Sequence, residues 1–272
     1  MPLAVLTYHS HHVVGPGYAD NDHVAFARDL DTLTDAGWRI VPLDEIVRVQ
    51  RHGTPLHLCA LTFDDGPVYD VDDVVHPAYG RQVGFANAMR AFAERRPGAQ
   101  PGLHATSFVI ASPQARLAME SHADPRYTWL APGSMGEAWW TRAIDSGLVA
   151  IANHSWDHLH PALPRVRHSR DARGDFAQVV TAADADAQVR DAAAYLDAAT
   201  QGRASPYFAY PFGQHNTFLA RDYLPSVGRD VCAAAFTTEP RLCSIDDSPF
   251  LLPRFVCGAD WRAPDELIER LV

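Results

Sequence analysis

Short apolar runs alternate along this chain with segments whose apolar residues recur at helical spacing. The apolar runs predict strands at 3–7, 38–41, 56–63, 105–110, 148–152, 207–210, 232–236 and 251–256. Spacing such as that of Phe26, Leu30 and Leu33 predicts helices at 24–33, 43–49, 85–92, 138–144, 179–196, 218–224 and 264–271. Repeated strand-then-helix order indicates a parallel α/β sheet, and seven or eight such units favour a barrel. The segments at 66–84, 111–137 and 160–178 are expected to be long loops.

Composition narrows the class of protein. The length of 272 residues suits one barrel, so we expect a single catalytic domain over 1–272. A hydrophobic content of 47% and a charged content of 21% exclude disordered, collagen-like and coiled-coil chains. No apolar stretch reaches 18 residues, so no membrane-spanning segment is expected. The net charge of −10 argues against a nucleic-acid partner, although the run Arg165, Arg167, His168, Arg170 and Arg173 is locally basic and could meet an anionic substrate.

The first residues and the cysteines bear on the cellular compartment. The start lacks a basic region and a long apolar run, so a cytoplasmic protein is expected if Met1 is the native start, and an exported one if a signal was removed. Cys59, Cys232, Cys243 and Cys257 form no CxxC pair, so no structural zinc site is predicted. A disulfide among the last three stays open.

Polar clusters follow four of the predicted strands. Barrel enzymes place their chemistry where strands end, so these clusters are the candidate site. They are Tyr8-His9-Ser10, the run Thr62 to Pro67, the run Asn153 to His158, and Pro211-Phe212-Gly213.

Each cluster has an alternative interpretation when taken alone. Asp64 and Asp65 point to opposite sides of a strand end, so one could bind a metal while the other faces substrate, yet Asp-Gly-Pro is also common in turns. His154 and His158 share one face if their segment is helical, and with an aspartate they would leave positions open for water on a catalytic zinc. Two merely hydrogen-bonded histidines would show the same spacing.

Together the clusters resemble a known family. Thr-Phe-Asp-Asp-Gly-Pro at 62–67 followed by Asn-His-Ser-x-x-His at 153–158 resembles the polysaccharide deacetylases, carbohydrate esterase family 4, which includes the nodulation-type chitooligosaccharide deacetylases. Weaker similarity continues at 105–109, 208–213 and 252–255. The resemblance implies a distorted (β/α) barrel of seven to eight units. It also implies that Asp64 is the general base and that Asp65, His154 and His158 bind a divalent metal, most often Zn²⁺, with Asn153 and Ser155 orienting the histidines.

The chain departs from the commonest family pattern in two places. The third family motif usually carries an arginine, and here Ala209 and Tyr210 stand in its place, so Arg254 is the candidate replacement; an ordinary salt bridge is the alternative. In most members of the family, the histidine that serves as the general acid lies near the C-terminus, where this chain has no histidine. A circularly permuted strand order would bring His9 there, as in the poly-N-acetylglucosamine deacetylase branch, which the chain resembles most. His9 is therefore the expected general acid.

The expected partner is an N-acetylated carbohydrate or another amide substrate. Tyr210, Pro211, Phe212 and Trp129 are the residues assigned to substrate contacts, with a backbone N–H near Tyr210 facing the oxyanion. Trp129 belongs with Tyr127, Trp139 and Trp140, which could stack on sugars or fill the core. The loop with Asp70, Asp72, Asp73 and His76 is expected to be solvated. Two alternative functions remain: a small-molecule amidase similar to allantoinases, and an inactive carbohydrate-binding barrel. The oligomeric state is open.

Overall fold

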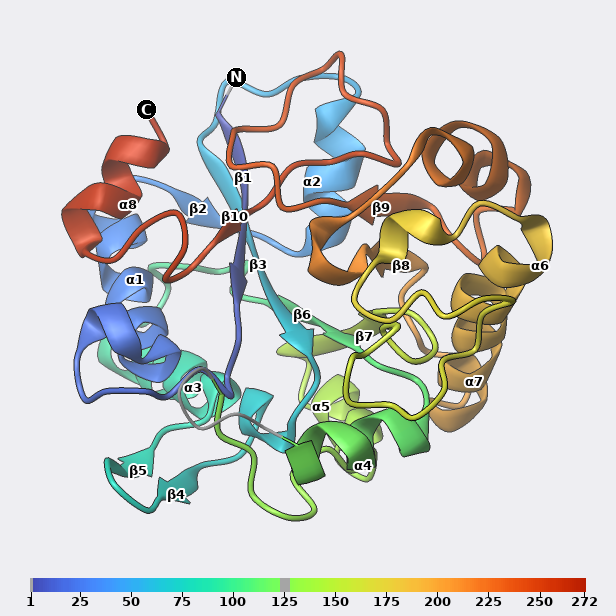
Figure 1. Ribbon diagram of the computed structural model, residues 1–272. Helices are drawn as coiled ribbons and strands as arrows, with labels where there is room; N and C mark the ends of the chain where they lie inside the picture. Colours follow the sequence, from blue (N-terminus) through green and yellow to red (C-terminus); the bar gives the residue numbers. More distant parts are fainter. Residues whose placement is uncertain (1, 123–127) are drawn as a thin grey trace.

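The computed structural model describes residues 2–122 and 128–272 and contains one eight-stranded parallel sheet, in the order β10-β1-β3-β6-β7-β8-β9 with β2 beside β3 (Figure 1). A separate hairpin joins β4 and β5 in antiparallel pairing. The strands are β1 Leu3–Tyr8, β2 Arg39–Ile40, β3 Leu58–Asp65, β4 Val74–His76, β5 Gly80–Gln82, β6 Ala105–Val109, β7 Val149–Asn153, β8 Tyr207–Ala209, β9 Ala234–Phe236 and β10 Phe255–Val256.

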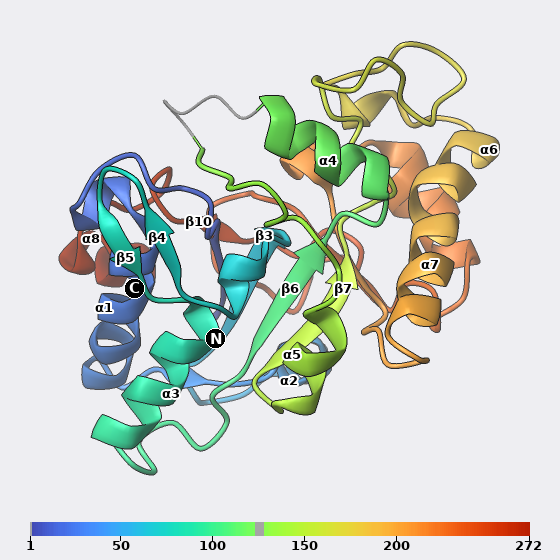
Figure 2. The ribbon, with the colours of Figure 1, turned by 90° about the horizontal axis from the view of Figure 1, so that it is seen from below.

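Helices surround the strands, as Figure 2 shows for α1, α3, α5 and α7. They are α1 Asp22–Asp35, α2 Leu43–Gln50, α3 Phe85–Arg95, α4 Pro113–His122, α5 Trp140–Asp145, α6 Ala182–Ala185, α7 Asp191–Ala199 and α8 Pro264–Arg270. A π-helical turn at Asp186–Arg190 joins α6 to α7, so the predicted long helix exists and ends a few residues later than expected. In the part of the chain described, no helix has the length and apolar character to cross a membrane.

The sheet curls until its first and last parts meet. Phe236 of β9 forms a parallel bridge with Leu252, and three residues later Phe255 of β10 pairs with Leu6 of β1. The segment 252–256 therefore pairs with β9 at its start and with β1 at its end. The predicted α/β barrel is confirmed, and β1 lies beside the last strand, as the expected permuted order requires.

Burial explains why these segments form these elements. Every residue of β1 and β3 is buried, as expected for parallel strands covered on both faces. In α1, Phe26, Leu30 and Leu33 turn inward, which confirms the predicted spacing. The Asn21 side chain caps this helix by accepting hydrogen bonds from two amides of its first turn.

Two segments that were expected to be loops contain regular structure. Helix α4 lies within 111–137, and the β4–β5 hairpin lies within 66–84. The loop with Asp70, Asp72, Asp73 and His76 was expected to be solvated, and this is wrong for its buried carboxylate. Asp70 is fully buried and accepts hydrogen bonds from the Ser10 and Ser107 hydroxyls, while Asp73 caps the start of α3 through the Gly84 amide. The four cysteines are free and buried, so none of the possible disulfides forms.

Candidate active site

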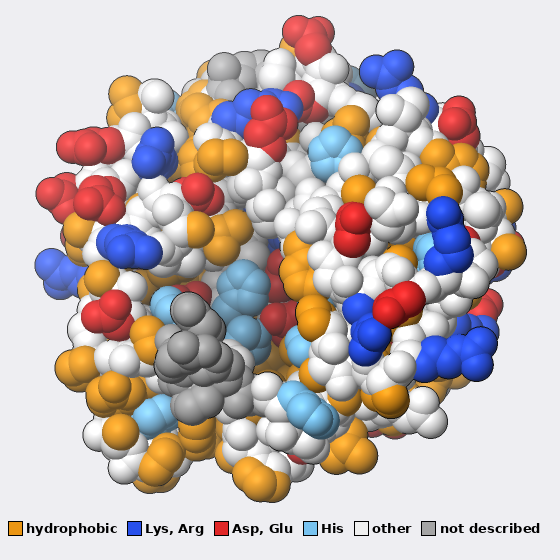
Figure 3. All heavy atoms as spheres, viewed as in Figure 1, with side chains coloured by type: hydrophobic (Ala, Val, Ile, Leu, Met, Phe, Trp, Pro, Cys, Tyr) orange, Lys and Arg blue, Asp and Glu red, His pale blue; other side chains and the backbone are white. Residues whose placement is uncertain are grey.

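A cavity of about 610 Å³ opens at the carboxyl ends of the strands. Figure 3 shows a hollow on this face in which histidine and acidic side chains gather. The end of β3 and the loops after β1 and β7 supply most of its histidines and carboxylates. The lining includes His9, His11, Asp64, Asp65, His154, His158 and Phe212. Strand ends that lie far apart in sequence thus contribute to one site, as predicted.

Asp65, His154 and His158 form a group that fits a metal ion. The Nε2 atoms of His154 and His158 lie 3.7 and 3.6 Å from Asp65 Oδ1. Metal–ligand bonds of about 2.0–2.1 Å in a tetrahedral site place ligands roughly 3.3 Å apart, so these spacings need only a small contraction. Asp65 Oδ1 is buried and has no hydrogen-bond partner in the described chain. Buried carboxylate oxygens are normally paired, so a metal ligand role would account for this atom.

The two histidines present the correct atoms without belonging to a helix. The shared helical face considered for this pair is wrong, because 154–158 is a loop with positive φ at Ser155 and His158. The Ser155 hydroxyl accepts the His158 amide, and His154 Nδ1 donates to the Ala209 carbonyl, which leaves the His154 Nε2 lone pair free. Burial and neighbouring His154 lower the pKa of His158 to about 3, so this imidazole is neutral and can act as a ligand.

Asp64 lies beside this group and is held by Arg254. The guanidinium donates to both carboxylate oxygens at 2.8 Å, and both side chains are buried. Arg254 also donates to the Thr237 carbonyl and lies over the Phe108 ring. Burial acts to raise the pKa of Asp64, but the Arg254 charge and hydrogen bonds, together with the charges of His154 and His9, outweigh it and lower that pKa below its ordinary value. Arg254 is therefore the guanidinium partner of Asp64 for which the sequence made it the candidate.

His9 follows β1 directly and lines the same cavity. Its backbone N–H donates to Asp22 Oδ2 at 2.7 Å, which fixes the turn after the strand. Burial lowers the pKa of His9, while the charges of Asp65 and Asp64 oppose that shift and favour the protonated imidazole.

Three of the residues assigned to substrate contacts lie elsewhere. Tyr210 is fully buried, and its hydroxyl donates to the Phe250 carbonyl. Pro211 is buried too and does not line the cavity. Trp129 does not line the cavity; its ring stacks on Tyr69 and contacts the tilted ring of His76. Tyr127 lies outside the described residues, and Trp139 and Trp140 are core residues.

The remaining substrate candidate, Phe212, does reach the cavity, where its ring meets the edge of His158. The Tyr210 N–H is engaged by the Phe236 carbonyl and is not available to an oxyanion. The Phe212 N–H, two residues on, has no partner in the described chain, and its φ of 57° gives the turn an unusual conformation. This amide is the better candidate for the predicted oxyanion contact.

Sequence reasoning missed His11. Its imidazole contacts Asp65 and lines the cavity, two residues beyond His9. The only sequence signal is a third polar side chain just after a strand end, which loops show commonly.

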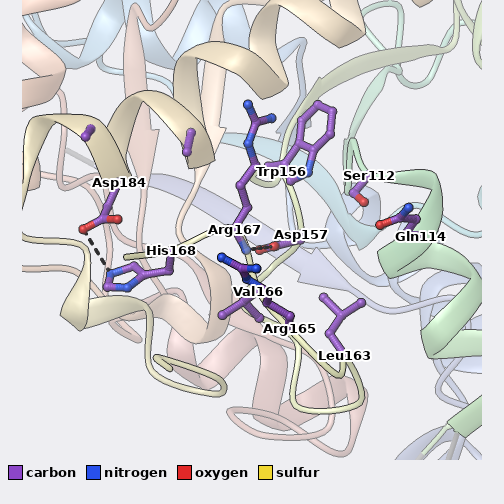
Figure 4. Close-up of a pocket in the computed structure, with 12 residues that line it drawn as sticks. Ser112, Gln114, Trp156, Asp157, Leu163, Arg165, Val166, Arg167, His168 and Asp184 are labelled. Atoms are coloured by element: carbon purple, nitrogen blue, oxygen red, sulfur yellow. Dashed lines mark hydrogen bonds and ion pairs between the residues drawn. The ribbon is translucent and has the colours of Figure 1, made fainter. Parts of the chain in front are cut away.

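The locally basic run lies along a second hollow of about 490 Å³, drawn in Figure 4. There His168 faces Asp184 at 3.5 Å, and Arg167 pairs with Asp191 and lies over the Trp156 ring. These charges are largely balanced locally.

Comparisons with known proteins agree with this geometry. The family model described as Polysaccharide deacetylase matches residues 52–225, a segment that holds Asp64, Asp65, His154 and His158. His9 and Arg254 lie outside that segment. No curated protein matches the chain.

Solved structures show the same fold at low identity. The Streptococcus pyogenes deacetylase PplD in complex with acetate has a TM-score of 0.64 and 16% identity, over 99% of this chain and 98% of that one. A de-N-acetylase from Aggregatibacter actinomycetemcomitans has a TM-score of 0.62 and 14% identity, over 99% of each chain. IcaB from Ammonifex degensii has a TM-score of 0.59 and 17% identity, over 94% of each chain.

Proposed function

The chain belongs to the polysaccharide deacetylase family, and from this membership we propose that it is a metal-dependent hydrolase that removes N-acetyl groups from an N-acetylated sugar polymer or oligomer. The observation that carries the proposal is the pairing of a buried Asp65, His154 and His158 group with an ionised Asp64 in one cavity. The similarity in fold to a protein described as a de-N-acetylase supports the same bond type.

The metal would be held by Asp65 Oδ1 and the Nε2 atoms of His154 and His158. A divalent cation such as Zn²⁺ supplies Lewis acidity, which lowers the pKa of water and polarises the acetamide carbonyl. Three protein ligands leave coordination positions open, as in catalytic zinc sites. Carboxylate and imidazole ligands bind several first-row divalent metals, and zinc is the one that we propose.

The protein side chains would move the protons. Asp64 accepts the proton of the attacking water, and the Arg254 fork keeps this carboxylate ionised and aimed. The Phe212 N–H donates to the developing oxyanion. His9, on the neighbouring strand end, gives its proton to the departing amine, which then leaves as the free amino sugar.

The test is a paired measurement of metal content and acetate release. Elemental analysis of the purified protein is followed by assay of acetate release from N-acetylglucosamine oligomers, with and without chelator. The proposal predicts bound zinc and acetate release that chelator abolishes and added zinc restores. Bound metal without acetate release from any oligomer would contradict the proposed substrate and favour a small-amide hydrolase instead.

A further inference from the structure

We propose that His11 is a positioning residue that fixes the Asp65 carboxylate so that only one of its oxygens is offered to the metal. This inference rests on the metal site of the proposed function and adds a residue that neither the family motifs nor the ligand group contains.

The two oxygens of Asp65 have different surroundings. His11 Nε2 lies 2.8 Å from Oδ2, whereas Oδ1 has no partner in the described chain and faces the two histidine ligands. A free carboxylate can bind a cation through either oxygen or through both. Because His11 engages Oδ2, rotation of the carboxylate would break a charge-assisted hydrogen bond, and Oδ1 is left as the single ligand atom.

A second hydrogen bond engages the other ring nitrogen of His11. Thr128 Oγ1 lies 2.7 Å from His11 Nδ1. An ionised carboxylate only accepts, so Nε2 must carry the hydrogen that Asp65 receives. The Thr128 hydroxyl can donate to a bare Nδ1 or accept from an Nδ1–H, so both contacts are satisfied whenever Nε2 carries a hydrogen.

The backbone holds this chain in place. The Trp129 N–H donates to the His11 carbonyl at 2.8 Å. Residues 128–129 therefore contact His11 through its main chain as well as through its imidazole. The side chains of His11 and Asp65 are only 12% and 11% exposed, so water competes weakly for their hydrogen bond. Asp65 has a φ of 73°, in the left-handed region that few non-glycine residues adopt, so its backbone conformation is one that surrounding contacts must hold.

The same contact ties the metal site to the cavity wall. Thr128 and Leu130 both line the cavity. A displacement of this wall would therefore reach the Asp65 carboxylate through His11.

The test measures zinc affinity of the full-length, metal-stripped protein by competition with a fluorescent chelator. Removing a partner of a metal ligand costs typically 10–100-fold in metal affinity. His11→Phe keeps a ring but donates nothing to Oδ2, so we expect zinc binding to weaken by about 10–100-fold. His11→Gln places an N–H near the lost Nε2 and is expected to recover most of that affinity.

A matched control is available at the next residue. His12 makes the same kind of contact, 2.7 Å from Asp22, but does not line the cavity. His12→Phe should leave zinc affinity unchanged. Thr128→Val removes only the hydroxyl donor and should weaken zinc binding by about two- to tenfold, the range for one neutral hydrogen bond. Cobalt-substituted protein gives a second readout, because a change from one to two Asp65 oxygens alters the visible absorption of Co²⁺.

The outcomes separate this inference from the proposed function. Equal zinc affinity of His11→Phe and wild type would overturn it, as would His11→Gln binding no better than His11→Phe. If His11→Phe does not fold, judged by thermal melting without metal, unchanged affinity of Thr128→Val would overturn it instead. A wild type that binds zinc yet releases no acetate refutes the proposed function alone, and a wild type that binds no divalent metal refutes both.

Discussion

Replacing Arg254 by methionine should destabilise the metal-stripped protein strongly and in a pH-dependent way. Arg254 has no exposed surface, and it makes two hydrogen bonds of 2.8 Å to Asp64, which is itself 3% exposed. Methionine fills similar space and retains contact with Phe108, so the main loss is the charge. Removing one partner of a buried pair costs about 3–5 kcal/mol because the other charge is left unpaired.

The pH dependence of this loss follows from the pKa of Asp64. In the wild type this pKa is lowered, so the pair stabilises the fold above the unfolded pKa of about 3.9 and its contribution disappears as the pH falls through the folded pKa. In Arg254→Met, burial is opposed only by the weaker charges of His154 and His9, so the pKa of Asp64 should rise and ionising this carboxyl should destabilise the fold. The difference in free energy of unfolding between the two proteins should therefore be smaller near pH 4 than at pH 7, and it should grow across that range because ionising Asp64 increasingly destabilises the variant.

The assay is urea unfolding followed by tryptophan fluorescence at several pH values, with chelator present. Asp64→Asn and the double variant Arg254→Met/Asp64→Asn complete a thermodynamic cycle, because the double variant leaves no charge unpaired. We expect the double variant to lose at least about 2 kcal/mol less than the sum of the single variants, a coupling typical of residues in direct contact. Additivity within about 0.5 kcal/mol, or a loss that does not change between pH 4 and pH 7, would refute the reasoning.

Three further predictions test individual side chains. Asp64→Asn should retain metal but lose about 10²–10⁴-fold in acetate release, because the proposed base is gone and the proposed ligands remain. Loss of metal in elemental analysis would instead make Asp64 a ligand. The control is Asp191→Asn, which removes a carboxylate from an exposed ion pair. His9→Ala should likewise keep its metal and lose about 10²–10⁴-fold in the same assay, and near-normal turnover would remove His9 as the proton donor. Burial raises the pKa of Asp70 to about 7, so this carboxyl should lower the wild-type free energy of unfolding by at most about 4 kcal/mol as the pH rises from 4 to 7. Asp70→Asn should remove this contribution and flatten the pH dependence measured by urea unfolding. An unchanged pH dependence in the variant would contradict the prediction.

The architecture could be predicted from local patterns because each strand is a short apolar run that reports its own burial. Helix α4 was missed for a physical reason: much of its surface is exposed, with Leu117 63% accessible, so it lacks a strong apolar stripe. The β4–β5 hairpin is equally hard to predict. Its strands have three residues each, and Val75 is 72% exposed, so no buried face marks its register.

Site prediction depended on how each side chain is positioned. Asp64 and Asp65 are the last two residues of β3 and His154 directly follows β7, so the barrel topology itself brings them together. Tyr210 also stands at a strand end, yet its side chain points into the core, because alternation along β8 decides its direction and one sequence does not reveal the phase. His11 was missed for a different reason. Its contact with Asp65 crosses 54 positions of sequence and depends on a turn that no local pattern specifies.

Closure of the sheet brings Arg254 to the candidate active site. Asp64 lies at the end of β3, one residue before its last, whereas Arg254 comes from the closing segment 190 residues later. His9 directly follows β1, the strand that lies between them in the sheet. The closing segment reaches its place only because Leu252 pairs with Phe236 on one side and Phe255 with Leu6 on the other. Arg254 lies between these two anchors, and its Nε donates to Thr237 at the end of β9. Asp64 is thus held by a residue whose position depends on closure of the barrel, whereas Asp65, His154 and His158 come from β3 and from the loop after β7, which belong to adjacent parts of the sheet.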